Sequence, residues 1–145
     1  MFIKYTTNEQ CFINFSICRV VKLKDDFVEN VSLDKSFDYA VRIVNLCKYL
    51  NNEKKENIMS KQLLRCGTSV GANVSEAQRG QLLADFTTKM CIALKEANES
   101  EYWLRLLYKT DYLEEKQFES IHKDAEDLIN ILTSICKTSQ EKMKI

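Results

Sequence analysis

The residues best suited to chemistry are one histidine, His122, and six cysteines. Glu119 and His122 form one Glu-x-x-His element, which is part of the metal site in di-iron helical bundles. Such a site needs two of these elements together with two further glutamates that face the core. Because the chain has a single histidine, the second element cannot be built, and we expect neither a metal nor another cofactor.

The cysteines are widely spaced and contain no Cys-x-x-Cys pair, so neither a zinc site nor a redox motif is indicated. A cysteine nucleophile would need His122 beside it, and also an orienting group and an oxyanion site. No spacing points to that arrangement, so we expect no catalytic residue and no small-molecule substrate. Free thiols are typical of a reducing compartment, which predicts a cytoplasmic protein. The six are Cys11, Cys18, Cys47, Cys66, Cys91 and Cys136.

The composition indicates one soluble, helical domain. The chain has 145 residues, no proline and only three glycines, so the usual breakers of long helices are nearly absent. Lysine plus arginine and aspartate plus glutamate both total 21, so net charge gives no long-range attraction to phosphate backbones. No uncharged run is longer than ten residues, and the apolar-looking run over residues 10–18 is well short of the roughly 20 residues of a membrane span, so we expect no membrane association.

Apolar residues recur at steps of three and four from residue 32 onward, which predicts four helices joined by short loops. Short loops make neighbouring helices antiparallel, so the expected fold is an all-α, up-down-up-down four-helix bundle. The expected domains are an extension over residues 1–30, a bundle over residues 31–138 and a tail over residues 139–145. The predicted helices are Asp34–Asn51, Asn57–Arg79, Ala84–Lys109 and Glu114–Thr138.

The first 30 residues show neither a helical period nor strict alternation. Two interpretations of this segment stay open: a mobile extension, or an arm that docks on a neighbouring subunit. After it, Ser32 or Asp34 is expected to cap the first bundle helix. Its apolar positions are expected to form the core side of the helix, and they are Phe37, Ala40, Val41, Val44, Leu46, Cys47 and Leu50.

Two glycines stand four residues apart inside the second predicted helix, at Gly67 and Gly71. Each glycine costs about 1 kcal/mol of helix stability relative to alanine, so close approach of another helix is the expected compensation. Ala93, Ala97 and Ser100 form a small face in the middle of the third helix. We therefore expect the second and third helices to be in close contact through these residues.

Aromatic residues near the end of the third helix give two alternatives. Trp103, with Tyr102 or Tyr108, is the predicted anchor of an oligomer interface. Alternatively, this region is a solvated acidic surface in which Arg105 pairs with Glu101 at i, i+4.

The basic residues Lys61, Arg65, Arg79 and Arg105 likewise have two interpretations. They are either contacts for RNA phosphates or ordinary solvated charges. The balanced net charge does not decide between these, because it says nothing about where the charges lie.

Four segments carry a family resemblance: Leu33–Phe37, Ser60–Ala77, Asp85–Phe86 and Ile92–Leu104. Together they make the chain, over residues 31–138, resemble the four-helix bundle proteins encoded in intervening sequences of bacterial 23S ribosomal RNA genes. The resemblance implies a homo-oligomer, typically a ring of five, with no known catalytic activity. A related branch, the accessory proteins of retroelements, has a strongly basic surface from which this chain departs.

Two functions are therefore expected from the sequence. The first is a non-enzymatic, self-associating assembly module that presents a surface to a macromolecular partner. The alternative is an RNA-binding protein associated with ribosomal RNA or its processing.

Overall fold

The structure, a computed structural model, describes the backbone of residues 9–144 and the side chains of residues 31–144. The chain divides into two units, residues 1–31 and residues 32–145, and the second unit holds the helical bundle. The prediction that residues 1–30 form an extension falls outside the residues whose side chains are described, and it stays a prediction.

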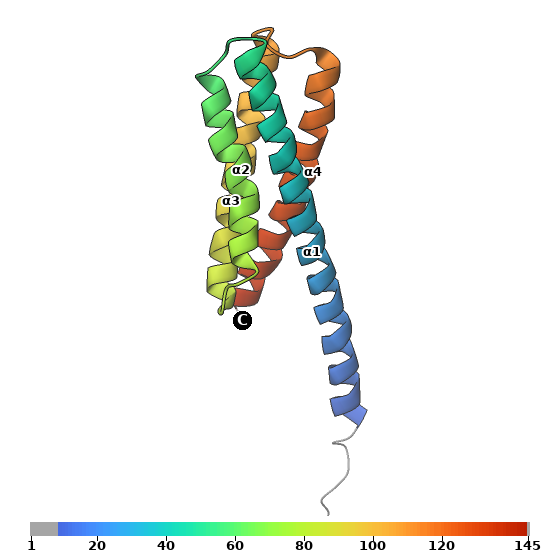
Figure 1. Ribbon diagram of the computed structural model, residues 1–145. Coiled ribbons are helices and arrows are strands. Elements are labelled where there is room, and N and C mark those ends of the chain that lie inside the picture. The colour runs from blue at the N-terminus through green and yellow to red at the C-terminus, as the bar shows by residue number, and fades with distance from the viewer. Residues whose placement is uncertain (1–8, 145) are drawn as a thin grey trace, which may run out of the picture. The chain divides into compact units, whose positions relative to one another are not determined.

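The described residues are helical apart from short turns. Within the second unit, α1 lies beside α2 and α4, and the predicted up-down-up-down bundle is confirmed (Figure 1). The prediction that Ser32 or Asp34 caps the first helix is wrong, because both residues lie inside it. The helices are α1 (Glu9–Asn52), α2 (Met59–Ala77), α3 (Leu83–Lys109) and α4 (Glu115–Met143).

The core sides of α2, α3 and α4 agree with the predicted apolar periodicity. The predicted residues near the helix ends, Met59, Phe86 and Phe118, are half-buried and pack on the core edge. The remaining predicted residues of these three helices are buried. They are Leu63, Gly67, Val70, Val74 and Ala77 in α2; Met90, Ala93, Ala97, Ser100, Leu104 and Leu107 in α3; and Ile121, Ala125, Leu128, Leu132 and Ile135 in α4.

The core side of α1 differs from the prediction. Phe37 and Val41 were expected in the core, but their side chains are 68% and 45% exposed. Cys47 and Leu50 are buried as predicted, and α1 also buries four residues that were not expected in the core: Ser32, Ser36, Tyr39 and Ile43. Ser32, Ser36 and Tyr39 all carry hydroxyl groups. The positions of the apolar residues alone therefore place the core side of α1 too far around the helix.

A buried hydrogen bond compensates for the polar atoms on this side of α1. The Tyr39 hydroxyl lies 2.8 Å from Ser100 Oγ, and Ser100 Oγ donates to the Ala97 carbonyl at 2.8 Å. Tyr39 is therefore the donor in the first bond. Burial raises the pKa of Tyr39, so the hydroxyl keeps its proton. The bond ties the middle of α1 to the middle of α3 across the core.

The two helical glycines make the close contact that their spacing predicts, but with α1 and not with α3. A Cβ on Gly67 would lie 2.9 Å from both Cγ atoms of Ile43. A Cβ on Gly71 would lie 3.2 Å from the Ser36 carbonyl oxygen, which is backbone. The predicted partners Ala93 and Ala97 are buried in α3, yet the atoms nearest to the glycines belong to α1. The small residues of α2 and α3 therefore did not reveal which helix makes the close contact with the glycines of α2.

Glu56 caps α2 from the preceding turn, a role that the sequence did not suggest. Its Oε1 accepts hydrogen bonds from the backbone N–H groups of Ile58 at 2.9 Å and Met59 at 2.8 Å, and its Oε2 accepts from Ser60 N–H at 2.7 Å. Burial raises the pKa of Glu56, but these three bonds outweigh burial, and the pKa lies below its ordinary value. The carboxylate satisfies donors that every helix start leaves unpaired.

We expect Gly71→Leu to lower the free energy of unfolding by about 1–3 kcal/mol, because the new side chain would meet the backbone of α1. The gain of roughly 1 kcal/mol from removing a helical glycine does not offset this clash. Urea unfolding followed by circular dichroism measures the effect. Ala72→Leu is the matched control, since Ala72 is exposed on the same helix. Equal stability of the two variants would contradict the contact.

We expect Glu56→Gln to destabilise the bundle at pH 7 by about 1 kcal/mol, the size of a lost helix cap. A carboxyl with a lowered folded pKa stabilises the fold above its unfolded pKa of about 4.3, and this stability is lost as the pH falls through the folded pKa. The variant should therefore lose less stability than the parent chain between about pH 5 and pH 2. Urea midpoints across this range measure the difference, and parallel pH curves for the two proteins would refute the cap.

Candidate functional site

One exposed apolar surface lies on α1. Phe37 and Val41 project from the bundle one helical turn apart, and Asp34 and Asp38 lie beside them in the same turns. These four residues are called the α1 face. Phe37 borders a surface hollow whose walls include Gly71 of α2. Neither aspartate forms an ion pair with another described residue.

The apolar periodicity of the sequence does not predict the α1 face, because it assigns Phe37 and Val41 to the core. A signal was present in the spacing. Asp34 and Asp38 stand three residues before Phe37 and Val41, so each aspartate shares a helix side with one of them. Because two aspartates lie on the same side of the helix as Phe37 and Val41, this side is expected to face solvent and not the core.

A second exposed surface lies on α3. Tyr102 is 56% exposed, and its ring makes an edge contact with Trp103 at a centroid distance of 5.3 Å. Lys95 and Arg105 stand seven residues before and three residues after Tyr102, so both lie on the same side of the helix. Lys95, Tyr102 and Arg105 are called the α3 face.

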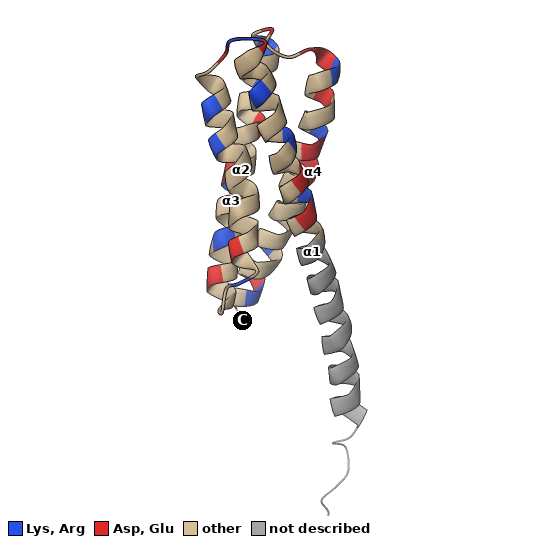
Figure 2. Cartoon of the chain, in the orientation of Figure 1, with Lys and Arg blue, Asp and Glu red and all other residues tan. Residues whose placement is uncertain are grey.

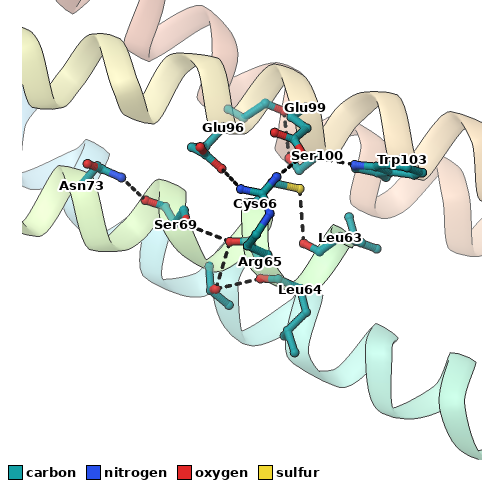
Figure 3. A network of polar contacts seen from close by, with 12 residues as sticks. Leu63, Leu64, Arg65, Cys66, Ser69, Asn73, Glu96, Glu99, Ser100 and Trp103 are labelled. Atoms are coloured by element: carbon teal, nitrogen blue, oxygen red, sulfur yellow. Dashed lines mark hydrogen bonds and ion pairs between the residues drawn. The ribbon is translucent and has the colours of Figure 1, made fainter. Parts of the chain in front are cut away.

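A cluster of polar side chains joins α2 to α3 next to the α3 face and holds Trp103 in place (Figure 3). Arg65 pairs with Glu99 and lies 3.4 Å from Glu96, while Trp103 Nε1 donates to Glu99 at 3.4 Å. The hydrogen bond between Arg65 and Glu99 raises the pKa of the arginine and lowers that of the glutamate. Trp103 is half-buried and anchored by this cluster, so it supports Tyr102 from one side.

Tyr108, the third residue of the predicted oligomer interface, is separate from the other two. Its ring stacks on Phe118 of α4 with a centroid distance of 4.4 Å and an interplanar angle of 4°. The structure therefore brings Tyr102 and Trp103 together and directs Tyr108 to a contact within the bundle.

His122 of α4 lies next to this ring stack and also contacts α3. Its ring lies on Phe118, its Nε2 donates to Glu101 at 2.9 Å, and its Nδ1 lies 3.7 Å from Glu126. Glu101 and Glu126 contact different nitrogens of the His122 ring. The two carboxylates and the imidazole therefore cannot bind one metal ion together. Within residues 31–144 no cluster of histidine, cysteine and acidic side chains suits a metal. Glu119, the other half of the Glu-x-x-His element, is exposed.

The four predicted RNA contacts do not form one basic surface. Lys61 and Arg79 are exposed on α2 and in the turn after it. Arg65 is held by two glutamates, and Arg105 lies 3.7 Å from Glu101, which confirms the predicted i, i+4 pair. In the view of Figure 2, lysines and arginines alternate with acidic residues, and acidic residues are frequent along α4. RNA contact by these residues stays a prediction.

The cysteine thiols in the core are held in the protonated, unreactive form. Burial raises the pKa of Cys47 to about 11, that of Cys66 to about 12 and that of Cys136 to about 12. A cysteine nucleophile needs the opposite, a lowered pKa beside a base or a cation.

None of the described helices is long and apolar enough to cross a membrane.

Comparison with known proteins identifies a family. Residues 29–134 match the family model described as 23S rRNA-intervening sequence protein. A crystal structure at 1.70 Å resolution, of a protein of unknown function from the S23 ribosomal protein family of Bacteroides thetaiotaomicron VPI-5482, is 56% identical in sequence. The match covers 76% of this chain and 98% of that chain, with a TM-score of 0.74. No curated protein matches the chain significantly.

We expect the buried thiols to resist alkylation in the folded protein. At pH 8, a thiol with a pKa of about 12 is ionised in only about one molecule in ten thousand, and burial further blocks the reagent. Iodoacetamide labelling with peptide mapping should modify the half-buried Cys91 before Cys47, Cys66 and Cys136. All four should react at similar rates in urea. Fast labelling of Cys66 in the folded chain would contradict this prediction and reopen a role as nucleophile.

Proposed function

Because the chain belongs to the 23S rRNA-intervening sequence protein family, we propose that it is a non-enzymatic assembly module. The module associates with copies of itself, as a ring of five, and the ring presents a surface to a macromolecular partner. The α1 face and the α3 face are the contacts between copies.

The observation that carries this proposal is the exposure of large apolar side chains on two outer faces of a well-packed bundle. Phe37 projects from α1 with 68% of its side chain exposed, and Tyr102 projects from α3 with 56% exposed. Exposed apolar surface of this kind, rimmed by charges, is typical of protein interfaces. Tyrosine and tryptophan are also the residues that most often anchor such interfaces.

The existence of two different faces supports a ring. A ring with an odd number of identical copies cannot be built from one self-complementary patch, because each copy must contact its two neighbours through different surfaces. The α1 face and the α3 face lie on different helices and differ in charge, so one copy can use both at once.

Two features support a role without catalysis. The described thiols of the core have raised pKa values, and the one histidine is engaged by two carboxylates and a phenylalanine ring. The proposal also places the module in the cytoplasm, where free thiols such as those of Cys47 and Cys66 stay reduced.

We expect the full chain at micromolar concentration to have a mass of about 85 kDa, five times the 16.9 kDa of one chain. Sedimentation equilibrium and light scattering after gel filtration measure this mass directly. The ratio of absorbance at 260 and 280 nm of the same peak shows whether RNA is part of the particle. A mass of one chain across the micromolar range would refute the proposal, and a peak whose assembly depends on RNA would favour an RNA-binding function instead.

A further inference from the structure

We propose that the α1 face of one copy docks on the α3 face of the next copy, in a head-to-tail contact. This inference rests on the proposed self-association and names the two surfaces that meet. It commits to a second copy of this chain as the occupant of both faces.

The two faces are complementary in charge. Phe37 and Val41 on the α1 face are flanked by the acidic Asp34 and Asp38, and no described side chain pairs with either aspartate. On the α3 face, Tyr102 is flanked by the basic Lys95 and Arg105. An apolar surface with an acidic rim therefore meets an aromatic surface with a basic rim.

The acidic residues next to the α3 face are engaged by contacts within the molecule. Glu99 is paired with Arg65, and Glu101 accepts from His122 at 2.9 Å. Arg105 lies 3.7 Å from Glu101, but its side chain is 66% exposed. Lys95 has no ion pair with a described residue. Lys95 and Arg105 are thus both exposed on the same side of α3 as Tyr102, and Lys95 is the one that forms no ion pair with a described residue.

The same charges disfavour pairing of like faces. Two α1 faces in contact would bring Asp34 and Asp38 against the aspartates of the partner. Two α3 faces in contact would bring Lys95 and Arg105 against the same cations. Like charges across an interface repel, so a head-to-tail contact is favoured over a symmetric one.

The two faces lie on opposite sides of the bundle. Helix α1 neighbours α2 and α4, and α3 also contacts α2 and α4, so α1 and α3 are diagonal to each other. In Figure 1, α3 lies behind α1 and α2. Residues that point away from the core therefore point in opposite directions on α1 and α3, and neither contact blocks the other.

The heights of the residues along the bundle also agree. The Tyr39 hydroxyl of α1 is hydrogen-bonded to Ser100 Oγ of α3 at 2.8 Å, so the two residues lie within about one helical turn of each other along the bundle, and the two helices run in the same direction. Counting equal steps from this pair places Asp34 within about one turn of Lys95, and Val41 within about one turn of Tyr102. In the proposed ring, whose axis is parallel to the bundle, rotation from one copy to the next preserves these heights. Each copy therefore presents an acid to a base and an apolar side chain to an aromatic one.

A charge swap tests this pairing. We expect Asp34→Lys and Lys95→Glu each to raise the protein concentration at half-assembly by at least about tenfold, because each variant places like charges together. The double variant Asp34→Lys/Lys95→Glu should restore assembly, since every contact again joins opposite charges. Lys137→Glu, an exposed change on α4, is the matched control and should leave assembly unchanged. Thermal unfolding by circular dichroism checks that each variant is folded.

A mixing experiment tests the head-to-tail geometry. Val41→Arg breaks the α1 face and Tyr102→Asp breaks the α3 face, so each variant alone should sediment with the mass of one chain. Mixed at equal amounts, they should form a one-to-one pair, because each supplies the face that the other lacks.

The outcomes separate this inference from the proposed function. If the parent chain assembles but the single charge variants assemble equally well, the inference is wrong and self-association stands. If the double variant assembles no better than the single variants, Asp34 and Lys95 do not meet. If the parent chain has the mass of one chain, both proposals fail.

Discussion

The close approach of α1 to α2 at Gly67 and Gly71 is the contact on which the other features of this bundle depend. A Cβ at Gly71 would lie 3.2 Å from the carbonyl oxygen of Ser36, so any larger residue would push the two backbones apart. With the axes this close, Ser36 and Ile43 fill the narrow space between α1 and α2. The rotation of α1 that places them inward turns Phe37 outward. A packing constraint inside the bundle thereby creates an exposed apolar surface on its outside.

The hydrogen bond between Tyr39 and Ser100 adds a constraint along the bundle axis. An apolar core tolerates sliding of one helix past another better than a core with a single buried polar pair, because sliding leaves buried hydroxyl groups without partners. The bond therefore fixes how far α1 is advanced relative to α3.

The sequence predicts α2, α3 and α4 well, since their core sides consist of apolar residues at steps of three and four. It fails for α1, because three of the residues that α1 buries, Ser32, Ser36 and Tyr39, carry hydroxyl groups. Their burial depends on bonds that periodicity does not reveal, such as Ser36 Oγ to the Leu33 carbonyl at 2.9 Å. The glycines announce a close contact but not its partner, because α1 and α3 are both neighbours of α2.

The candidate surfaces were predictable only in part, for a related reason. Tyr102 and Trp103 are too bulky for a core that is already filled, so their position on an outer face follows from the sequence of α3. The face on α1 requires the rotation of that helix, which depends on tertiary contacts.

The balanced net charge of the chain has a structural explanation that bears on its partners. Some charges are cancelled inside the molecule, as in the cluster of Arg65, Glu96 and Glu99. Other charges are segregated: Asp34 and Asp38 on the α1 face, and Lys95 on the α3 face, form no ion pair with another described residue. A neutral total hides this segregation, because the two faces carry opposite signs. A surface that binds nucleic acid needs an excess of one sign, whereas opposite signs on opposite sides favour addition of identical copies one after another. The arrangement of charge, more than its sum, therefore supports the proposed self-association.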